Sequence, residues 1–203
     1  MANQKYQLSF TAGGLLYSES IRLAHEYAHV NDWEVVAQRA REQRLLQSRT
    51  TSTEHRKIRE ICSRLRLLTD AEQAILREGT RADQLHVLWL AACKRYQFLH
   101  DFAEKMLRTK FLEMDYSLTA ADIERFMEIA SVWQEELESI TSSTRDKLRT
   151  VTLRMLREAD LVTDDGILQP ALLSRELVAA IRADSPDHLL IYPISPADLG
   201  GPT

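Results

Sequence analysis

Turn-forming residues are scarce through most of this 203-residue chain. All five prolines lie at or after Pro170, and Gly79 is the only glycine between residues 15 and 165. Because proline and glycine most strongly end helices and form tight turns, a long stretch almost without them favours helices joined by short polar caps. Valine, isoleucine and threonine do not alternate in runs there, which argues against a sheet. We therefore predict an all-α fold.

Cysteines and long apolar runs are also few. The two cysteines, Cys62 and Cys93, lie within apolar stretches, so they indicate a reducing compartment and cannot by themselves form a zinc site. The longest apolar run, residues 87–93, is far shorter than the ~20 residues that span a bilayer. The first ten residues do not resemble a signal peptide. We expect a soluble, cytoplasmic protein with no membrane contact, no metal and no other cofactor.

Capping residues divide the chain into eight expected helices. Thr69 with Glu72 and Thr119 with Asp122 have the spacing of capping boxes, and Gly79 is placed to end a helix. Residues 85–99 are apolar nearly all round, which predicts the central helix of the core, running on or kinking toward Met114. The expected helices are 15–29, 32–46, 52–68, 69–79, 80–99, 119–140, 143–159 and 174–183.

The chain changes character after residue 160. Apolar pairs flank Thr163-Asp164-Asp165-Gly166, a hairpin signal that predicts a minimal β-wing within residues 161–168. The expected architecture is a compact multi-helix globule with an N-terminal helical region at residues 1–114 and a C-terminal helical region at residues 115–183. Four prolines after Asp184 predict an extended tail over residues 184–203.

Charge is unevenly distributed along the chain, although the formal net charge is only −4. Residues 39–66 contain nine basic and three acidic side chains, and residues 144–157 contain five basic side chains and one acidic. Residues 113–138 contain eight carboxylates and only Arg125 as a base. Because binding of a polyanion depends on where charge lies, two basic segments kept apart from one acidic segment are compatible with nucleic-acid binding.

The first basic segment has the order of a helix-turn-helix. A helix ending near residue 46 is followed by a hydroxyl-rich turn and then by a basic helix. Free backbone N–H groups at a helix start, neighbouring hydroxyls and arginines together favour phosphate binding. The candidate contacts in this segment are Arg49, Thr50, Ser52, Thr53, Arg56, Lys57, Arg59 and Arg64.

The second basic segment repeats this order. Residues 141–144 (Thr-Ser-Ser-Thr) lead into a basic helix, and Trp133 on the preceding apolar face is expected to hold the two helices together. The candidate contacts are Arg145, Lys147, Arg149 and Arg154. Arginines on a single amphipathic helix are usually a solvated face. Two basic helices behind hydroxyl-rich turns favour nucleic-acid binding, mainly through phosphates.

One motif points to catalysis instead. His25-Glu26-Tyr27-Ala28-His29 matches H-E-x-x-H, which on a helix places two imidazoles on one side for zinc and a glutamate as general base. The following residues lack the glycine and third histidine of the longer metallopeptidase pattern. A third zinc ligand could then only be a distant carboxylate such as Glu54 or Glu60, and both lie on the basic helix. We interpret the match as coincidental and assign no catalytic residue.

Several segments, in order from Ser9 to Leu177, resemble the BrxA family of BREX (bacteriophage exclusion) defence systems. The resemblance implies an all-helical protein with helix-turn-helix elements that interacts with DNA beside other BREX components, and it supplies no catalytic motif. It also leaves open an RNA-binding role like that of NusB, or a protein scaffold, and we expect a monomer. The segments are Ser9-Phe10-Thr11-Ala12-Gly13-Gly14-Leu15-Leu16, Glu19-Ser20, Asp32-Trp33, Leu45-Leu46-Gln47, Arg49-Thr50, Leu88-Trp89-Leu90-Ala91, Arg95-Tyr96, Ser143-Thr144, Lys147-Leu148-Arg149, Arg154-Met155-Leu156-Arg157-Glu158-Ala159 and Pro170-Ala171-Leu172-Leu173-Ser174.

Overall fold

The structure, a computed structural model, describes residues 5–195. Helices dominate these residues, and none of them belongs to a β-strand, so the all-α prediction is confirmed. No helix in the described range combines the length and apolar character needed to cross a membrane. The elements are η1 (Ser9–Ala12), α1 (Tyr17–Val30), α2 (Trp33–Glu42), α3 (Thr51–Leu65), α4 (Asp70–Glu78), α5 (Arg81–Arg95), α6 (Gln97–Phe102), η2 (Ala103–Leu107), α7 (Arg108–Leu112), α8 (Ala120–Ser131), α9 (Glu135–Glu138), α10 (Ser142–Glu158), α11 (Arg175–Asp184) and η3 (Pro186–Ile191).

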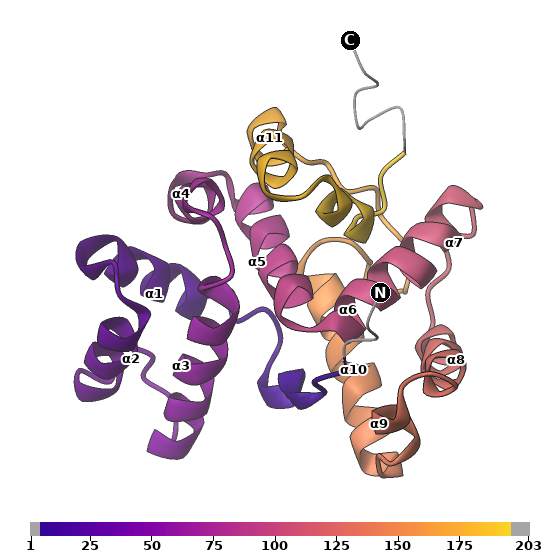
Figure 1. The fold of residues 1–203 in the computed structure, drawn as a ribbon, viewed down its shortest axis with the longest axis horizontal. Helices are drawn as coiled ribbons and strands as arrows, with labels where there is room; N and C mark the ends of the chain where they lie inside the picture. Colours follow the sequence, from indigo (N-terminus) through magenta and orange to yellow (C-terminus); the bar gives the residue numbers. More distant parts are fainter. Residues whose placement is uncertain (1–4, 196–203) are drawn as a thin grey trace.

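Helix α5 lies in the middle of the molecule, with α1, α2 and α3 on one side and α7, α8 and α9 on the other (Figure 1). It contacts α1, α3, α4, α6, α10 and η3, and its residues 83–93 are all buried. A helix that is apolar all round needs neighbours on every side, so its predicted central position is confirmed. Tyr96 is extended (φ −124°, ψ 103°), so the helix breaks there, and the chain continues through α6, η2 and α7.

Most of the predicted caps are confirmed. Thr69 and Thr119 form reciprocal capping boxes with Glu72 and Asp122. The other expected caps are Asp32, Thr80 and Ser174, and the side chain of each accepts a backbone N–H of the helix that follows it. Two helices are capped two residues before their expected starts at residues 52 and 143, because Thr50 caps α3 and Thr141 caps α10. These threonine hydroxyls accept from the third N–H of each helix and satisfy a donor that would otherwise be unpaired.

The prediction of one helix over residues 119–140 is wrong in its second half. Helix α8 ends at Ser131, Val132 is 84% exposed, and Trp133 is 42% exposed rather than part of the core. Residues Glu135–Glu138 form the separate short helix α9, whose first turn contains three glutamates. Carboxylates are favoured at the positive N-terminal end of a helix and disfavoured at its C-terminal end, so a new helix start accommodates them better than a continued α8.

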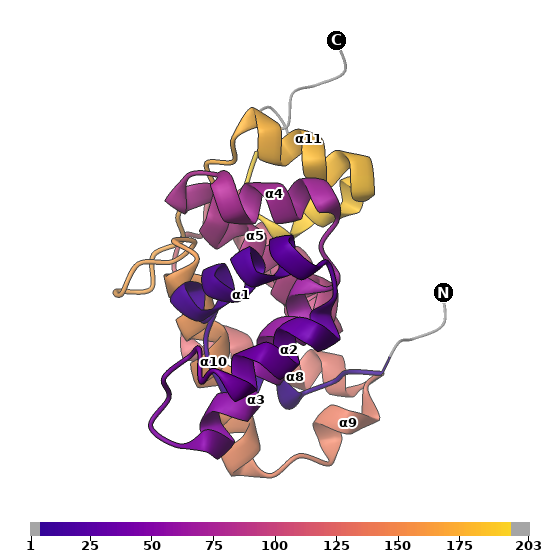
Figure 2. The same cartoon turned by 90° about the vertical axis from the view of Figure 1, so that its left-hand side faces the viewer.

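The wing and the tail both differ from their predicted forms. Val162 and Leu168 form an isolated antiparallel bridge around the turn at residues 163–166, and residues 116–118 lie alongside it. This turn projects from the body of the molecule at the left of Figure 2. The tail is not extended over Pro186–Ile191, where η3 packs Leu189 and Ile191 into the core. Residues 196–203 of the predicted tail lie outside the described residues.

One continuous cluster of buried apolar side chains runs from Tyr6 to Ile194. It includes residues of both expected helical regions, so the described part of the N-terminal region and residues 115–183 pack on a shared core. The burial of apolar area in such a cluster is the main favourable contribution to folding. Every surface described below is therefore held by the same core.

A buried polar network joins α3 to the rest of this core. Arg64 is only 3% exposed, its Nε donates to Glu60 Oε1 at 2.7 Å, and its Nη1 donates to the Gly14 carbonyl at 2.8 Å. The Tyr96 hydroxyl lies 2.7 and 2.8 Å from the two Glu60 oxygens. Burial and the Glu60 carboxylate raise the pKa of Tyr96 to about 12, so its hydroxyl stays a donor. The network ties α3, the Gly13-Gly14 turn and the α5–α6 junction together.

Removal of Arg64 should strongly destabilise the protein. In Arg64→Met the Glu60 carboxylate stays buried without its cation, a situation that typically costs about 3–5 kcal/mol. We expect a lower free energy of unfolding in urea denaturation. Arg66→Met is the control, because Arg66 pairs with Glu34 on the surface, at 44% and 77% side-chain exposure, and such pairs contribute about 1 kcal/mol or less. Equal effects of the two substitutions would contradict a structural role for the buried pair.

Candidate nucleic-acid interface

The loop between α2 and α3 is held by buried and bridging side chains. It covers residues 43–50, longer than expected, because α2 ends at Glu42 rather than near residue 46. The Glu54 carboxylate, on a residue 1% exposed, accepts the Leu46 N–H at 3.1 Å and pairs with Arg44 at 3.4 Å. From α1, Arg22 donates to the Leu45 carbonyl. Figure 2 shows this loop arching outward before α3 begins. These contacts therefore hold the loop that leads into α3 in one position.

Five basic residues of segment 39–66 are exposed and form no ion pair within the described residues. They are Arg39, Arg41, Arg49, Arg56 and Arg59. Ser52, Arg56 and Arg59 follow one another at the spacing i, i+4, i+7, which places them on one side of α3. The buried Ile58, Ile61, Cys62 and Leu65 lie on the opposite side. The face of α3 that points to solvent is therefore basic.

The other two candidate bases of α3 lie elsewhere. Arg64, expected to project outward, is buried in the network described above, so its assignment to an outer surface is wrong. It shares its side of the helix with Lys57 and Glu60, and this side faces α1 and the Gly14 turn. Lys57 is partly exposed and pairs with Glu19 of α1 at 2.8 Å. Burial opposes the ionisation of Glu19, yet Lys57, a backbone hydrogen bond and Arg22 together outweigh burial and lower the pKa of that carboxyl.

The candidate hydroxyls lie at the exposed start of α3. Thr50, Ser52 and Thr53 are all exposed. Thr50 Oγ1 accepts the Thr53 N–H at 3.2 Å, and the Thr50 hydroxyl donates to Thr53 Oγ1 at 2.8 Å. The first turn of α3 is thus partly satisfied by its own cap, and an anion there would meet hydroxyls and the remaining N–H groups.

Helix α10 is only partly basic at its surface. Arg145 pairs with Glu124 of α8 at 2.9 Å, and Arg149 pairs with Asp146 at 2.7 Å and lies 3.7 Å from Glu124. Lys147 and Arg154 are exposed, and neither forms an ion pair among residues 5–195. The expected separation from the acidic segment 113–138 therefore fails at α10. It holds at α3, because no ion pair of residues 39–66 reaches that segment.

The two basic helices meet at one cleft. Lys57 of α3 and Arg154 of α10 both line it, beside Gly14 and the start of α1. Arg81 and Arg157 line it as well, and neither was among the candidate contacts. Arg157 could have been found, because it belongs to the basic run 144–157, whereas Arg81 stands alone at the start of α5 without a sequence signal.

The H-E-x-x-H residues do not gather a ligand set. His25 and His29 are both exposed on α1, and no third histidine, cysteine or carboxylate joins them within the described residues. A zinc peptidase site needs three protein ligands around one open position. The local arrangement thus offers two of the three ligands that this chemistry requires.

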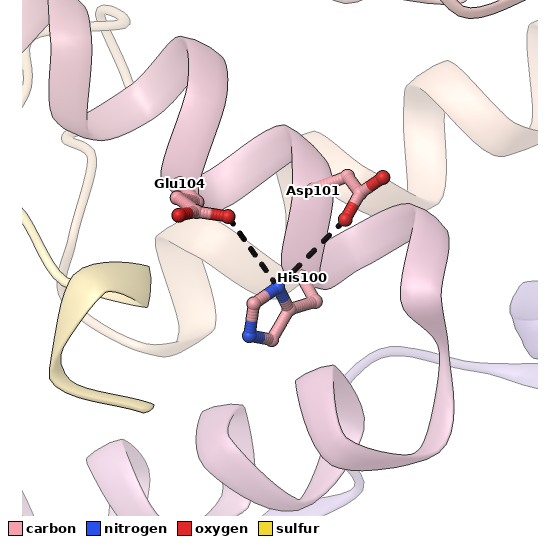
Figure 3. Close-up of side chains that lie close together, drawn as sticks. All are labelled: His100, Asp101 and Glu104. Atoms are coloured by element: carbon pink, nitrogen blue, oxygen red, sulfur yellow. Dashed lines mark ion pairs between the residues drawn. The ribbon is translucent and has the colours of Figure 1, made fainter. Parts of the chain in front are cut away.

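A different group of possible metal ligands converges at the end of α6. The carboxylates of Asp101 and Glu104 lie 3.8 and 3.9 Å from the same nitrogen, Nδ1 of His100 (Figure 3). Asp101 is already engaged, because Oδ2 accepts from Tyr6 at 2.7 Å and Lys105 at 3.1 Å, and Oδ1 accepts from Gln97 at 2.6 Å. These bonds tie the N-terminal segment to α6, so the cluster has a structural explanation.

The BrxA family model matches residues 4–185 of the chain. Among solved structures, the chain is similar to an uncharacterized protein from Magnetospirillum magneticum, with a TM-score of 0.78 and 20% sequence identity. The alignment covers 93% of this chain and 97% of that protein, and at this identity it shows a shared fold. No curated protein matches the chain.

The Asp101 cluster should make stability depend on acid. Burial opposes ionisation of Asp101, but His100, whose Nδ1 lies 3.8 Å away, and the hydrogen bonds from Tyr6, Gln97 and Lys105 together outweigh burial and hold its pKa below the ordinary 3.8. Its contribution is therefore complete above that value and is lost as pH falls through the lowered pKa. We expect Asp101→Asn to cost about 2–3 kcal/mol in urea denaturation at neutral pH, and much less in acid. The exposed Asp187→Asn is the control; a penalty for Asp101→Asn that does not change with pH would contradict this assignment.

Proposed function

The chain belongs to the BrxA family of BREX phage-defence proteins, and from this premise we propose that it is a non-enzymatic accessory that binds double-stranded DNA. The proposed contacts are mainly to phosphates, through the outer face of α3 and, more weakly, through α10. Other BREX components are its expected partners.

One observation carries the proposal: the outer face of α3 contains exposed cations without carboxylate partners. Arg56 and Arg59 lie on one stripe with Ser52, and Arg49 precedes the helix. Guanidinium groups match phosphate oxygens in a bidentate way, and neutralising backbone phosphates releases counterions. Because the cations on this face are not already paired, binding a polyanion does not first require breaking internal ion pairs.

The acidic segment supports the same orientation. Its carboxylates pair with α10 through Glu124 rather than with α3. A polyanion is repelled by the acidic side of the molecule and attracted to α3, so charge alone orients the encounter. Arg145 and Arg149 are partly neutralised, which is why we assign α10 the smaller contribution, through Lys147 and Arg154.

Charge reversal on α3 should abolish most DNA binding. We expect Arg56→Glu/Arg59→Glu to bind random-sequence duplex at least about tenfold more weakly in fluorescence anisotropy, because two phosphate contacts become repulsive. The slope of log Kd against log salt should also fall by ~0.9 for each phosphate that the variant no longer neutralises. Unchanged affinity in the folded variant would remove α3 from the interface.

The matched control is Arg125→Glu/Arg175→Glu. It changes the net charge by the same amount at two exposed arginines, one on α8 and one on α11. Figure 1 shows both helices away from α3, with α8 on the opposite side of the molecule and α11 at the top. An equal loss of affinity in both variants would indicate a non-specific effect of charge.

The same titration with a matched RNA tests the second candidate, a NusB-like role. Preference for RNA would replace the DNA proposal. If the protein binds neither nucleic acid, the result supports the role of a protein scaffold.

A further inference from the structure

The cleft where the two basic helices meet has the properties of a ligand site. It measures about 650 Å³, within the ~300–1,000 Å³ of typical ligand pockets, and the start of α1, α3, α5 and α10 all contribute to it. Its basic side chains come from three of these helices: Lys57, Arg81, Arg154 and Arg157. Cations brought together from separate parts of the sequence repel one another, so such a group favours an anionic occupant.

Its acidic residues are mostly already engaged. Glu19 pairs with Lys57, and Glu158 accepts the Leu15 N–H. Asp160 is the third acid at the cleft. The four cations thus exceed the three carboxylates by one charge. Within the described residues, Arg81 and Arg154 form no ion pair, and Arg157 donates only to the Asp164 carbonyl, at 3.0 Å. Three guanidinium groups therefore keep free donors at the cleft.

The backbone adds further positive potential to the same cleft. Helix α1 begins at Tyr17, its 14 residues form a full helix dipole, and its N-cap residue, Leu16, supplies no side-chain acceptor for the first N–H groups. Tyr17 and Ser18 line the cleft, and the Arg81 guanidinium lies 4.9 Å from the centre of the Tyr17 ring. A Cβ on Gly14 would lie 2.1 Å from Glu158 Oε2, so only glycine lets this carboxylate approach the turn. The wall of the cleft is built from these close contacts.

We propose that this cleft binds a phosphate group. One excess positive charge, guanidinium donors and an uncapped helix start match the charge and the acceptor oxygens of a phosphate ester. The remaining volume leaves room for the nucleoside or strand that carries the phosphate. The phosphate belongs either to a free nucleotide or to the backbone of bound DNA; the second source rests on the proposed function, and the first is independent of it.

The test uses the full chain and the variant Arg81→Gln/Arg157→Gln, whose positions lie outside the α3 stripe. Thermal unfolding is measured with inorganic phosphate or dAMP against chloride at equal ionic strength, and DNA affinity is measured across a salt series. A free phosphate should raise Tm of the wild type by roughly 2–4 °C at several times Kd, and should not raise Tm of the variant. A DNA phosphate should instead give a salt slope that is ~0.9 lower in the variant.

Three controls keep the outcome clear. Arg81→Gln alone retains the bond from Arg157 to Asp164 and replaces the double variant if that one unfolds. Arg125→Gln/Arg175→Gln matches the change in charge away from the cleft. The α3 variant Arg56→Glu/Arg59→Glu should keep its response to free phosphate, so failure of the α3 interface and failure of the cleft are distinguishable. No Tm response and no change of slope at the cleft would overturn the proposal.

Discussion

The buried ion pair between Arg64 and Glu60 is the constraint on which the orientation of α3 depends. Both charges lie out of water, and the pair is satisfied only where the Gly14 carbonyl and the Tyr96 hydroxyl are also present. A buried charge without its partner is costly, so α3 cannot rotate about its axis without exposing or orphaning one of them. Because successive residues of a helix turn by a fixed angle, an inward Arg64 fixes Arg56 and Arg59 outward. The surface follows from the interior.

This constraint gives residues of one type different environments within one helix. Arg64 holds the fold, Lys57 bridges to α1 through Glu19, and Arg56 and Arg59 face solvent without partners. Net charge cannot distinguish these environments, because it sums all of them with the carboxylates of segment 113–138. What matters to a polyanion is which cations those carboxylates pair with: Glu124 pairs with Arg145 and lies 3.7 Å from Arg149 on α10, whereas no carboxylate of that segment pairs with residues 39–66.

The sequence predicted the parts of this arrangement that depend on local chemistry. Thr69, Thr119 and Gly79 marked helix ends correctly, because capping satisfies N–H groups within a few residues of the cap. The apolar run around Trp89 identified the central helix, because a helix that is apolar on every side needs neighbours on every side. Positions set by tertiary contacts were not predictable from the sequence. The predictions that Arg64 points outward, that Trp133 is buried and that the tail is extended were wrong, because each of these positions depends on which distant residues lie nearby in the fold. Arg81 carries no pattern at all, since only the fold brings it beside Arg154 and Arg157.

The same reasoning links the cleft to the outer face of α3. Lys57 follows Arg56 in the chain and lines the cleft from the side of α3 that faces α1, so one helix carries both the outer basic face and one side of the cleft. On the other wall, Arg154 escapes the neutralisation that Glu124 imposes on Arg145 and Arg149. The two arginines of α10 that form no ion pair among the described residues, Arg154 and Arg157, therefore both line the cleft. The sequence shows two basic segments, and in the folded chain both contribute to one cleft, the first through Lys57 and the second through Arg154 and Arg157.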